Sequence, residues 1–383
     1  MKIYVCIPSF NEEQTISNVV TLVDQGLQVI CSSKGLPIEV KIVNIDSASE
    51  DNTVANFKTT FTTFPKESVS ITPPRGKGKN LLAFIRKAYI EKATYCLTID
   101  VDIKSASPRW IIDLLKPILD NQADFVTPLY QRSRFEGSST NHFAFPMVFA
   151  TTGATVRQPI AGDFAFNSKL IDIIHNVQVP DFINCYGIDI FLTLSALTKG
   201  LAHKQVMLDQ KLHNPSFTKL EYMFPQIAAS TLFTLREVGI RTSSIIPSEI
   251  QSTNIASGIS FSHKSAAIEM QQRALLLLNS INPSEFDWIS CELFQKIRSS
   301  GDITSSEWVI ILANWLKKGL LYKHIDELLL ANQLLPFFII RAINFWKLSE
   351  KLNAIEVENQ LYNQAKELGS FLYNIVNANQ KQL

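Results

Sequence analysis

Two aspartates separated by a single residue stand at the end of an apolar run, in the segment 98–102 (TIDVD). If this run is a strand, Asp100 and Asp102 both lie where the chain leaves the edge of a sheet. Two carboxylates in such a position suit a hard divalent cation such as Mn2+ or Mg2+. A bound cation of this kind can neutralise a diphosphate and promote its departure as a Lewis acid. A solvated acidic turn explains the pair equally well when the segment is taken alone.

A basic, glycine-rich segment, 75–80 (RGKGKN), precedes the aspartate pair. Its glycines can let backbone N–H groups approach phosphate oxygens, and Lys77 adds a positive charge near the start of a predicted helix. The segment is not a P-loop, because its Gly-Lys pair is followed by glycine and not by serine or threonine. A flexible basic loop is the alternative interpretation.

Three later segments also carry groups that suit such a site. His213 stands in the segment 211–215 (KLHNP), and a neutral imidazole is a good ligand for Mn2+, although a single histidine is more often structural. The segments 158–164 (QPIAGDF) and 185–189 (CYGID) each place an acidic residue beside glycine and an aromatic ring. That combination suits the wall of a sugar-binding site, where hydroxyls need acceptors and ring faces need apolar contacts. A turn between core elements is the alternative for each.

Alternating strand and helix signals in the first hundred residues place these segments in a fold. Four apolar runs predict strands, over 3–7, 40–45, 69–72 and 95–99. We expect Asn11 to cap the first helix, a second helix to span 80–92, and Ser107 with Pro108 to open a third. The alternation predicts an α/β fold with a mostly parallel sheet and helices on both faces. Ligands of such sheets bind beyond the carboxyl ends of the strands, which is where the polar segments fall.

The second half of the chain has a different pattern. Mixed signals with glycines and aromatic residues extend to about residue 213, and helical signals dominate after residue 217. Apolar residues recur at helical spacing in 265–279 and 306–319. We therefore predict a domain over 1–220 and a mainly helical region over 221–383. This region is expected to pack on the first domain or to build a homo-oligomer, and the sequence leaves both alternatives open.

The composition is that of an ordinary globular protein, with 46% hydrophobic and 19% charged residues and a formal charge of +1. This charge gives no global attraction to nucleic acid. The five cysteines include no CxxC pair, which argues against a disulfide framework and indicates a reducing compartment. The longest apolar stretch, 334–343, is broken by Pro336 and Arg341, so we expect no transmembrane segment. We also expect no signal peptide and a cytoplasmic location.

Several of these segments together resemble a known enzyme family. The segment 7–13 (IPSFNEE) resembles the opening of the large glycosyltransferase family with the GT-A fold, a Rossmann-like α/β fold. The segment 46–53 (DSASEDNT) resembles the second nucleotide-contact segment of that family. The later order of GKG, DVD, QPIAGDFAF, YGIDI and KLHNPSF is similar to that of the retaining mannosylglycerate synthases and glucosyl-3-phosphoglycerate synthases. The resemblance covers roughly residues 1–220 and is more specific than any single motif.

The resemblance implies roles for individual residues of this sequence. Those implied to contact the nucleotide or its sugar are Pro8, Phe10, Asn11 and Glu12 in the nucleoside pocket, Asp46 and Ser47 at the base, Lys77 at the diphosphate, Asp100 at the ribose or sugar, Gly162 and Asp163 beside the donor sugar, and Tyr186 with Asp189 at the junction of donor and acceptor. The implied metal ligands are Asp102 and His213, with Asp100 as a further candidate.

One departure from the family pattern concerns the acceptor loop. The phosphoglycerate enzymes have a Gly-Arg-x-Thr segment there, and the matching stretch in this chain is 137–140 (GSST). Thr140 is retained, whereas the arginine that grips phosphate is absent, and serine cannot replace a bidentate arginine. Arg132 and Arg134 stand nearby and can substitute for it. The change nevertheless favours an acceptor without a phosphate group.

The resemblance implies a metal-dependent transfer of a hexose from a UDP- or GDP-hexose to a small hydroxylated acceptor, a glycerate-like acid or a polyol, with retention. Asp189, Asp163 and Lys77 are the expected catalytic residues, with Asp189 positioning sugar or acceptor. Alternatives are an inverting transferase of the same fold that acts on a glycan or glycolipid, and a non-catalytic protein that binds sugar nucleotides. A sugar-nucleotide pyrophosphorylase is disfavoured, because the first predicted strand leads into PSFNEE and not into a glycine-rich loop.

Overall fold

A computed structural model describes residues 1–34, 38–212, 219–240 and 264–380. The chain forms two compact units, which are described separately. Unit 1 comprises residues 1–130 and 158–218, and unit 2 comprises residues 131–157 and 219–383. The second boundary lies close to the division expected at residue 220, but residues 131–157 group with the C-terminal helices. The division at residue 220 into two domains stays a prediction.

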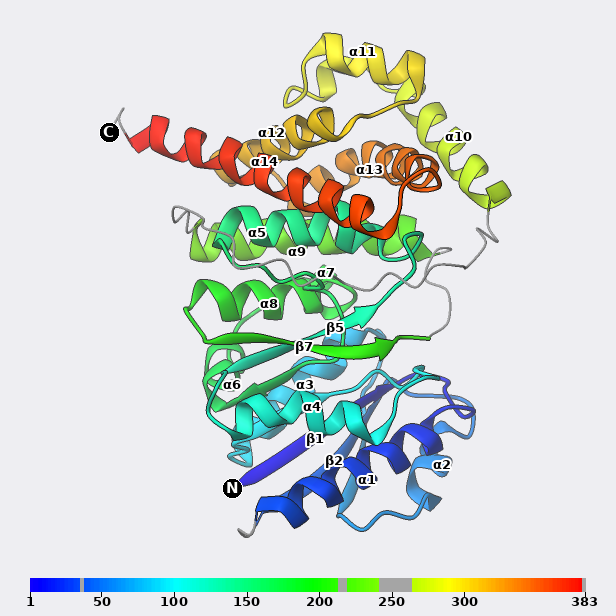
Figure 1. Cartoon of the computed structure of the whole chain (residues 1–383), viewed down its shortest axis with the longest axis vertical. Helices are drawn as coiled ribbons and strands as arrows, with labels where there is room; N and C mark the ends of the chain where they lie inside the picture. The colour runs from blue at the N-terminus through cyan, green and yellow to red at the C-terminus, as the bar shows by residue number, and fades with distance from the viewer. Residues whose placement is uncertain (35–37, 213–218, 241–263, 381–383) are drawn as a thin grey trace. The chain divides into compact units, whose positions relative to one another are not determined.

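Unit 1 is built on a seven-stranded sheet with the order β3-β2-β1-β4-β6-β5-β7 (Figure 1). Its strands are β1 Lys2–Ser9, β2 Glu39–Asp46, β3 Lys66–Ser70, β4 Tyr95–Thr98, β5 Phe125–Gln131, β6 Ala165–Asn167 and β7 His203–Gln210. Strands β1 to β4 pair in parallel, whereas β6 runs antiparallel to both β4 and β5. The α/β fold is therefore confirmed, with a mixed sheet because β6 enters between β4 and β5.

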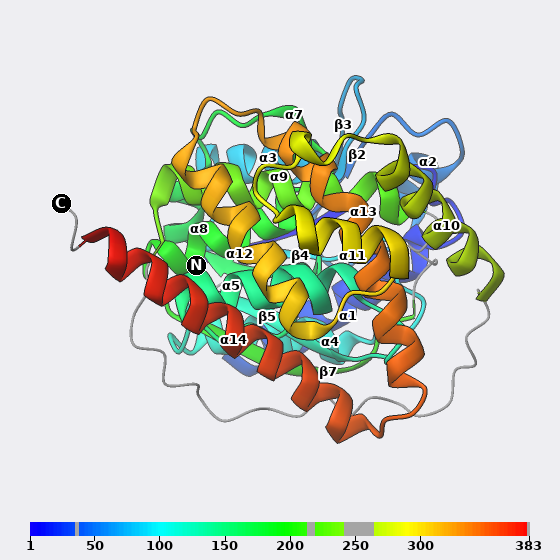
Figure 2. The ribbon, with the colours of Figure 1, turned by 90° about the horizontal axis from the view of Figure 1, so that it is seen from above.

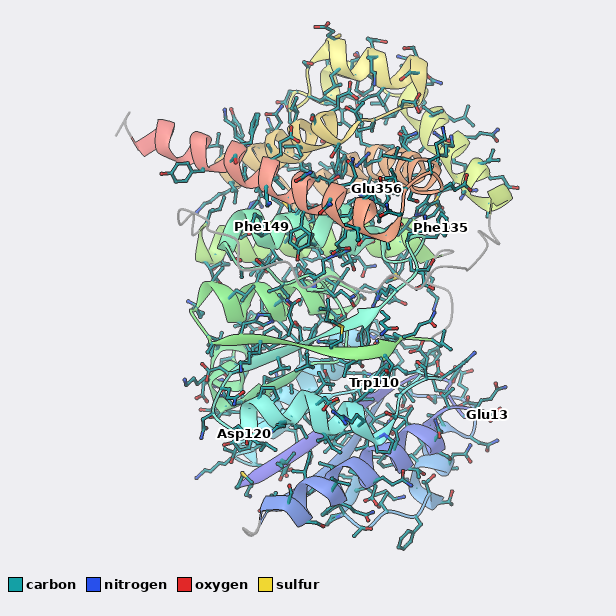
Figure 3. All side chains as sticks on the ribbon, viewed as in Figure 1. Glu13, Trp110, Asp120, Phe135, Phe149 and Glu356 are labelled. Atoms are coloured by element: carbon teal, nitrogen blue, oxygen red, sulfur yellow. The ribbon has the colours of Figure 1, made fainter. Side chains whose placement is uncertain are left out.

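The helices of unit 1 connect these strands. They are α1 Ile16–Lys34, α2 Thr53–Thr59, α3 Lys77–Ile90, α4 Pro108–Leu119, α6 Ser168–Ile174, α7 Asp181–Asn184 and α8 Ile188–Thr198. Right-handed crossovers put α1 and α3 on opposite faces of the sheet, because the chain moves outward from β1 to β3 and then returns across β1 to β4. Helix α1 packs against α4, and α3 packs against α6, α7 and α8. Trp110 of α4, labelled in Figure 3, packs its ring on that of Tyr130 at 5.1 Å.

Two of the predicted helix starts can be compared with the structure. Ser107 and Pro108 do begin α4, with proline in the first turn. The cap predicted at Asn11 is wrong, because α1 begins only at Ile16. Asn11 instead adopts a left-handed conformation with φ of 52°. Its N–H donates to Oγ of Ser49, and its Oδ1 accepts from the N–H of Glu50, both at 2.9 Å. The residue therefore ties the loop after β1 to the loop after β2.

Apart from Gln131, the last residue of β5, the regular elements described in unit 2 are helical. Its elements are the π-helix Thr140–Ala144, α5 Phe145–Thr152, α9 Leu220–Val238, α10 Lys264–Ser280, the short 3-10 turn Pro283–Glu285, α11 Cys291–Ser300, α12 Ser305–Leu321, α13 Glu327–Ser349 and α14 Ala354–Gln380. The helices predicted over 265–279 and 306–319 are confirmed as α10 and α12. Helix α14 packs on α5 and α12 (Figure 2). Phe149, labelled in Figure 3, forms a core cluster with Phe145, Tyr362 and Ala365.

Helix α13 is long and apolar enough to cross a bilayer, and it is the one such helix among the described residues. However, 67% of its most apolar window is buried inside the protein. The core helix of a globular unit has the same properties, so the length and composition of α13 are weak evidence for a membrane span. Arg341 lies within it and is 3% exposed.

Candidate active site

Five charged side chains from distant parts of the sequence meet in unit 1 and alternate in sign. In spatial order they are Asp163, Lys211, Asp100, Lys77 and Asp189. Lys77 is the first residue of α3, and Asp189 lies in the first turn of α8. Asp100 follows β4, and Lys211 follows β7. We call these five residues the charge chain.

Lys211 is the most completely satisfied member of the charge chain. Its Nζ donates to Oδ2 of Asp100 at 2.9 Å, to Oδ2 of Asp163 at 2.7 Å and to the carbonyl of Ala161 at 3.0 Å. These three acceptors use all three N–H bonds of the ammonium group. The ammonium also lies 5.1 Å from the centre of the Tyr130 ring. Burial opposes the charge, but Asp100 and Asp163 outweigh it and raise the pKa of Lys211.

Lys77 links Asp100 to Asp189 in the charge chain. Its Nζ lies 2.9 Å from Oδ1 of Asp100 and 3.2 Å from Oδ2 of Asp189. Burial favours the neutral amine, but the two carboxylates raise the pKa of Lys77 above its usual range. Burial would likewise raise the pKa of Asp100, whereas Lys211 and Lys77 hold it well below its usual range. Both oxygens of Asp100 are therefore bonded to ammonium groups.

Asp163 is the first member of the charge chain and is fully buried. Its Oδ1 accepts from the backbone N–H of Asp100 at 2.7 Å, and its Oδ2 accepts from the hydroxyl of Tyr130 in addition to Lys211. A carboxylate with this many donors is held rigidly. Asp163 thus fixes the backbone at which the DVD turn begins.

Asp189 is the last member of the charge chain, and its carboxylate has an incomplete set of hydrogen-bond partners. Its Oδ2 contacts Lys77, while its buried Oδ1 has no hydrogen-bond partner within the described structure. Burial raises the pKa of Asp189, an effect that Lys77 only partly offsets. The charge chain has three carboxylates and two ammonium groups, so one negative charge is left uncompensated. A buried acceptor without a donor is costly unless a ligand or water satisfies it.

The glycines of two motifs are explained by close packing. Gly162 has φ of +91°, and a Cβ there would lie 2.3 Å from Oδ2 of Asp100 and 2.8 Å from Nζ of Lys77. A Cβ on Gly76 would meet the carbonyl oxygen of Asn184 at 2.2 Å. The N–H of Gly78 donates to the carbonyl of Cys185 at 3.0 Å. The GKG segment therefore packs against the end of α7, and the N–H of Gly78 does not point freely toward a phosphate.

The predicted metal ligands are only partly described. Asp102 is partly exposed in the turn after β4, and His213 lies outside the described residues. Asp100, the further candidate, has both carboxylate oxygens bonded to lysines, and its role as a metal ligand stays a prediction. No group of three or more histidine, cysteine, aspartate or glutamate side chains that fits a metal ion occurs in the described parts of the chain. A complete metal site requires ligands beyond these, and His213 stays a prediction.

The residues predicted for the nucleoside pocket lie at the ends of β1 and β2 and in the loops that follow these strands. Pro8 is buried in β1, and the hydroxyl of Ser47 donates to Asn80 at 2.8 Å. Phe10 is 37% exposed, with the guanidinium of Arg75 4.1 Å above its ring. The N–H of Glu12 donates to Thr53 at 2.7 Å. The contact of Glu12 with Thr53 joins the segments after β1 and β2, whereas Ser47 and Phe10 contact α3 and the segment before it.

Asp46, predicted to contact the base, is 1% exposed. It accepts hydrogen bonds from the hydroxyl of Ser9 at 2.8 Å, from the hydroxyl of Ser49 at 2.6 Å and from the N–H of Ser49 at 2.8 Å. Both of its oxygens are therefore used inside the loops. In this structure Asp46 joins the end of β1 to the loop after β2, and its contact with a base stays a prediction.

The remaining predicted residues fall in two places. Tyr186 is partly exposed in the turn between α7 and α8, three residues before Asp189. Thr140 is 4% exposed and begins the π-helix of unit 2. Arg134, suggested as a substitute phosphate ligand, donates Nη1 to the carbonyls of Ser349 at 2.8 Å and Leu352 at 2.5 Å. It is thus committed to holding the turn between α13 and α14.

Two residues of the site were not anticipated, Lys211 and Tyr130. Lys211 opens the same KLHNP segment that contains His213, so the segment was recognised but the lysine was given no role. Tyr130 lies near the end of β5, a strand that the sequence analysis did not predict. The position of Lys211 two residues before a candidate ligand was the one local signal available.

Comparisons with known proteins concern the fold of the chain and the class of its domain. Residues 4–172 match the family described as Glycosyl transferase family 2. No curated protein sequence matches the chain. A crystal structure of glucosyl-3-phosphoglycerate synthase from Mycobacterium tuberculosis with Mn2+, UDP and phosphoglyceric acid is similar, at 24% identity and a TM-score of 0.50, over 63% of this chain and 80% of that chain. A second structure of that enzyme, with Mn2+, UDP-glucose and phosphoglyceric acid, is similar at the same identity and TM-score over 68% and 88%.

At this identity the two structures establish the fold, and the family match over residues 4–172 establishes the class of domain. The matched segment contains β1 to β6 and three of the five members of the charge chain, Lys77, Asp100 and Asp163. Asp189 and Lys211 follow it in the sequence. The chain therefore carries a glycosyl transferase family 2 domain with the GT-A fold, which makes it a glycosyltransferase.

Proposed function

We propose that this glycosyltransferase moves a hexose from a nucleoside diphosphate to a small hydroxylated acceptor, with retention at the anomeric carbon. The observation that carries the proposal is the charge chain with its unpartnered Asp189 oxygen. A buried carboxylate oxygen without a donor suits a hydroxyl of the sugar or of the acceptor. The fold neighbour was crystallised with UDP and phosphoglyceric acid, which supports a donor and acceptor of this kind.

In this proposal the residues of the charge chain mainly orient the donor and the acceptor. Lys211 and Asp163 hold Asp100 in place, and Asp100 presents its carboxylate edge toward the ribose or donor sugar. Lys77 keeps Asp189 ionised and fixed, and Asp189 accepts a hydrogen bond from the hydroxyl that it orients. Fixing reactants in this way supplies a large share of the rate enhancement of many enzymes. For Lys77 to contact the diphosphate as predicted, its ammonium group must bind the diphosphate in addition to Asp100 and Asp189.

We also propose a divalent cation, Mn2+ or Mg2+, held by Asp102 and His213. Asp102 fits this role because it is a partly exposed carboxylate directly after β4. When bound, the cation supplies positive charge to the leaving diphosphate. The fold neighbour contains Mn2+ beside UDP, which supports the assignment. Arginine is absent from the segment 137–140 and Arg134 is bound within unit 2, which favours an acceptor without phosphate. Arg132, whose Nη1 would lie 3.5 Å from a Cβ on Gly137, is the remaining arginine that could bind a phosphate at this segment.

A thermal-shift panel of UDP-, GDP- and ADP-sugars with Mn2+ or Mg2+ tests the donor and the cation together. One nucleotide sugar should raise the Tm only in the presence of the metal, because ligand that binds the native state stabilises it. Asp102→Ala and His213→Ala should each abolish the metal-dependent part of this shift. A full thermal shift in both variants would contradict the assignment of Asp102 and His213 as metal ligands, but it would still be consistent with binding of the nucleotide sugar. The configuration of the product, read by NMR of its anomeric proton, tests retention.

A further inference from the structure

Tyr130 is a fully buried tyrosine that contacts the charge chain with both its hydroxyl and its ring. The hydroxyl and Nζ of Lys211 donate to the same oxygen of Asp163, Oδ2. Nζ of Lys211 also lies 5.1 Å from the centre of the Tyr130 ring, a distance at which the ring attracts a cation. One tyrosine therefore restrains both the carboxylate and the ammonium group of this buried ion pair.

Neighbouring side chains hold Tyr130 itself in place. The amide of Gln158 binds its main chain on both sides, since Oε1 accepts from the N–H of Tyr130 at 3.3 Å and Nε2 donates to its carbonyl at 2.8 Å. The ring of Trp110 lies 5.1 Å from the Tyr130 ring. Main chain and ring are thus both fixed, which makes Tyr130 a rigid support for Asp163.

Two contacts carry this support to Asp100. Oδ1 of Asp163 accepts from the backbone N–H of Asp100 at 2.7 Å, and Nζ of Lys211 donates to Oδ2 of Asp100 at 2.9 Å. The main chain and the carboxylate of Asp100 therefore both depend on groups that Tyr130 restrains. Without the hydroxyl, Asp163 and the ammonium group of Lys211 can shift relative to each other, and Asp100 shifts with them.

The same three-residue arrangement occurs at the opposite edge of the sheet. The hydroxyl of Tyr4 and Nζ of Lys41 both donate to Oε2 of Glu91, at 2.7 and 2.6 Å, and this Nζ also lies 5.1 Å from the centre of the tyrosine ring. Tyr4 lies near the amino end of β1, whereas Tyr130 lies near the carboxyl end of β5.

The strand directions separate the two arrangements in function. Strand β1 is parallel to β4, and β5 points the same way because β4 and β5 are both antiparallel to β6. Ligands of such sheets bind beyond the carboxyl ends of the strands. The arrangement around Tyr4 is therefore remote from the candidate site, and it is also less buried, with side-chain exposures of 25% for Lys41 and 27% for Glu91.

We propose that Tyr130 is a positioning residue of the transferase, which acts through Asp163 and Lys211 to set the carboxylate of Asp100 against the donor sugar. The inference rests on the proposed function, in which Asp100 faces the donor. Because Tyr130 is fully buried, it acts through these residues and not by contact with the substrate. Its counterpart Tyr4 contributes to the stability of unit 1 and has no part in the reaction.

Tyr130→Phe and Tyr4→Phe form a matched pair of variants, because each removes one hydroxyl that donates to a carboxylate and keeps the ring beside its lysine. Each should lower the Tm by roughly 3–10 °C through the lost hydrogen bond to a charged group. Only Tyr130→Phe should lower kcat/KM for the nucleotide sugar, by about 10- to 100-fold, because misplaced reactants lose orientation. Tyr4→Phe should keep the kcat/KM of the parent when all three proteins are assayed well below their Tm.

A double-mutant cycle with Asp100→Asn separates positioning from a general structural effect. If Tyr130 acts through the Asp100 carboxylate, most of the effect of Tyr130→Phe on kcat/KM should vanish in the Asp100→Asn background. Where turnover of the Asp100 variants is too slow, the dissociation constant of the nucleotide sugar, measured by calorimetry with Mn2+, completes the same cycle. An equal fold-loss in both backgrounds would overturn the proposal.

Unchanged kcat/KM in folded Tyr130→Phe would also overturn the proposal, as would an equal loss of kcat/KM in Tyr4→Phe, and either result would leave the proposed function intact. A parent chain that neither cleaves nor binds any nucleotide sugar would overturn the proposed function and this inference with it. If Tyr130→Phe does not fold, Gln158→Met removes both bonds to the main chain of Tyr130 and should lower kcat/KM in its place. Unchanged kcat/KM in that variant would contradict the role of Tyr130.

Discussion

Nζ of Lys211 donates to Oδ2 of Asp163 at 2.7 Å although the two residues are 48 positions apart in the sequence. The contact joins the end of β7 to the segment that leads into β6. Because the same ammonium group also binds Asp100, a single lysine holds two buried carboxylates of the site. The first prediction follows from this arrangement.

Lys211→Met should destabilise the protein and abolish glycosyl transfer. The substitution leaves Asp100 and Asp163 without their common counter-charge, and breaking a buried ion pair in this way costs about 3–5 kcal/mol. Urea unfolding measures the loss. Lys204→Met in the adjoining strand β7 is the control, because Lys204 is exposed and its Nζ donates to Oε1 of Gln122 at the surface, so its effect should stay within about 0.5 kcal/mol. Equal effects of the two variants would contradict the role of Lys211.

Gly162→Ala should disrupt the pair formed by Lys77 and Asp100. The added Cβ would lie 2.3 Å from Oδ2 of Asp100, so the carboxylate must move in addition to the backbone strain at φ of +91°. Gly239→Ala supplies the matched control, because Gly239 has φ of +76° and nothing within 4 Å of its Cβ. Both variants should lose about 1 kcal/mol or more through strain. Only Gly162→Ala should also lose the thermal shift with nucleotide sugar.

Asp189→Asn should stabilise the free protein and lower turnover. Burial raises the pKa of Asp189, so the folded state binds its proton more tightly than the unfolded chain does. The contribution of this tighter proton binding to the free energy of unfolding is present below the pKa of Asp189 in the unfolded chain and is lost as the pH rises through its pKa in the folded protein. Ionised Asp189 is therefore unfavourable for the folded state at neutral pH. Asparagine avoids that charge and should raise the Tm above pH 7. Turnover should fall by about 100-fold or more, as expected for a group that acts in the transition state.

The parent enzyme should also lose activity on the acid side at a higher pH than an ordinary aspartate would allow, since Asp189 acts in its ionised form. A lower Tm of Asp189→Asn at neutral pH, together with unchanged turnover, would contradict both parts of this assignment.

His203 should make the folded state of unit 1 sensitive to acid. Burial lowers the pKa of His203 to about 4, and one ring nitrogen lies 2.9 Å from Oγ1 of Thr127. The unfolded chain therefore takes up the proton first as pH falls from about 6.5. The free energy of unfolding should decline between about pH 6.5 and pH 4. In His203→Gln this decline should become shallower, which urea unfolding at a series of pH values measures. An unchanged pH dependence would show that His203 is not responsible.

The sequence predicted the first half of the fold well because its signals are local. Strands β1, β2 and β4 are short apolar runs that end at polar segments, and Ser107 with Pro108 is a local helix-start signal. The cap at Asn11 failed because its side chain bonds to the loop after β2, an interaction between segments that no local pattern reveals. The antiparallel insertion of β6 and the grouping of residues 131–157 with the C-terminal helices are likewise set by tertiary contacts.

The candidate site shows the same division. Asp100, Asp163, Asp189 and Lys77 were found because they stand beside glycines or at strand ends. Lys211 was missed because its role arises only when β7 is placed beside the DVD turn. Gly162 was placed beside the sugar, whereas the structure adds that its missing side chain makes room for Asp100 and Lys77. The bonding of both Asp100 oxygens to lysines could not be read from the spacing of the DVD pair.

The most direct test of the transferase account measures nucleotide release from UDP-, GDP- and ADP-hexoses by the purified full chain with Mn2+, with and without glycerate as acceptor. The account predicts that one nucleoside diphosphate is released, that release requires the metal, and that Asp189→Asn slows it by about 100-fold or more. Failure of every nucleotide sugar to be cleaved or to raise the Tm, while the protein remains folded, would contradict it.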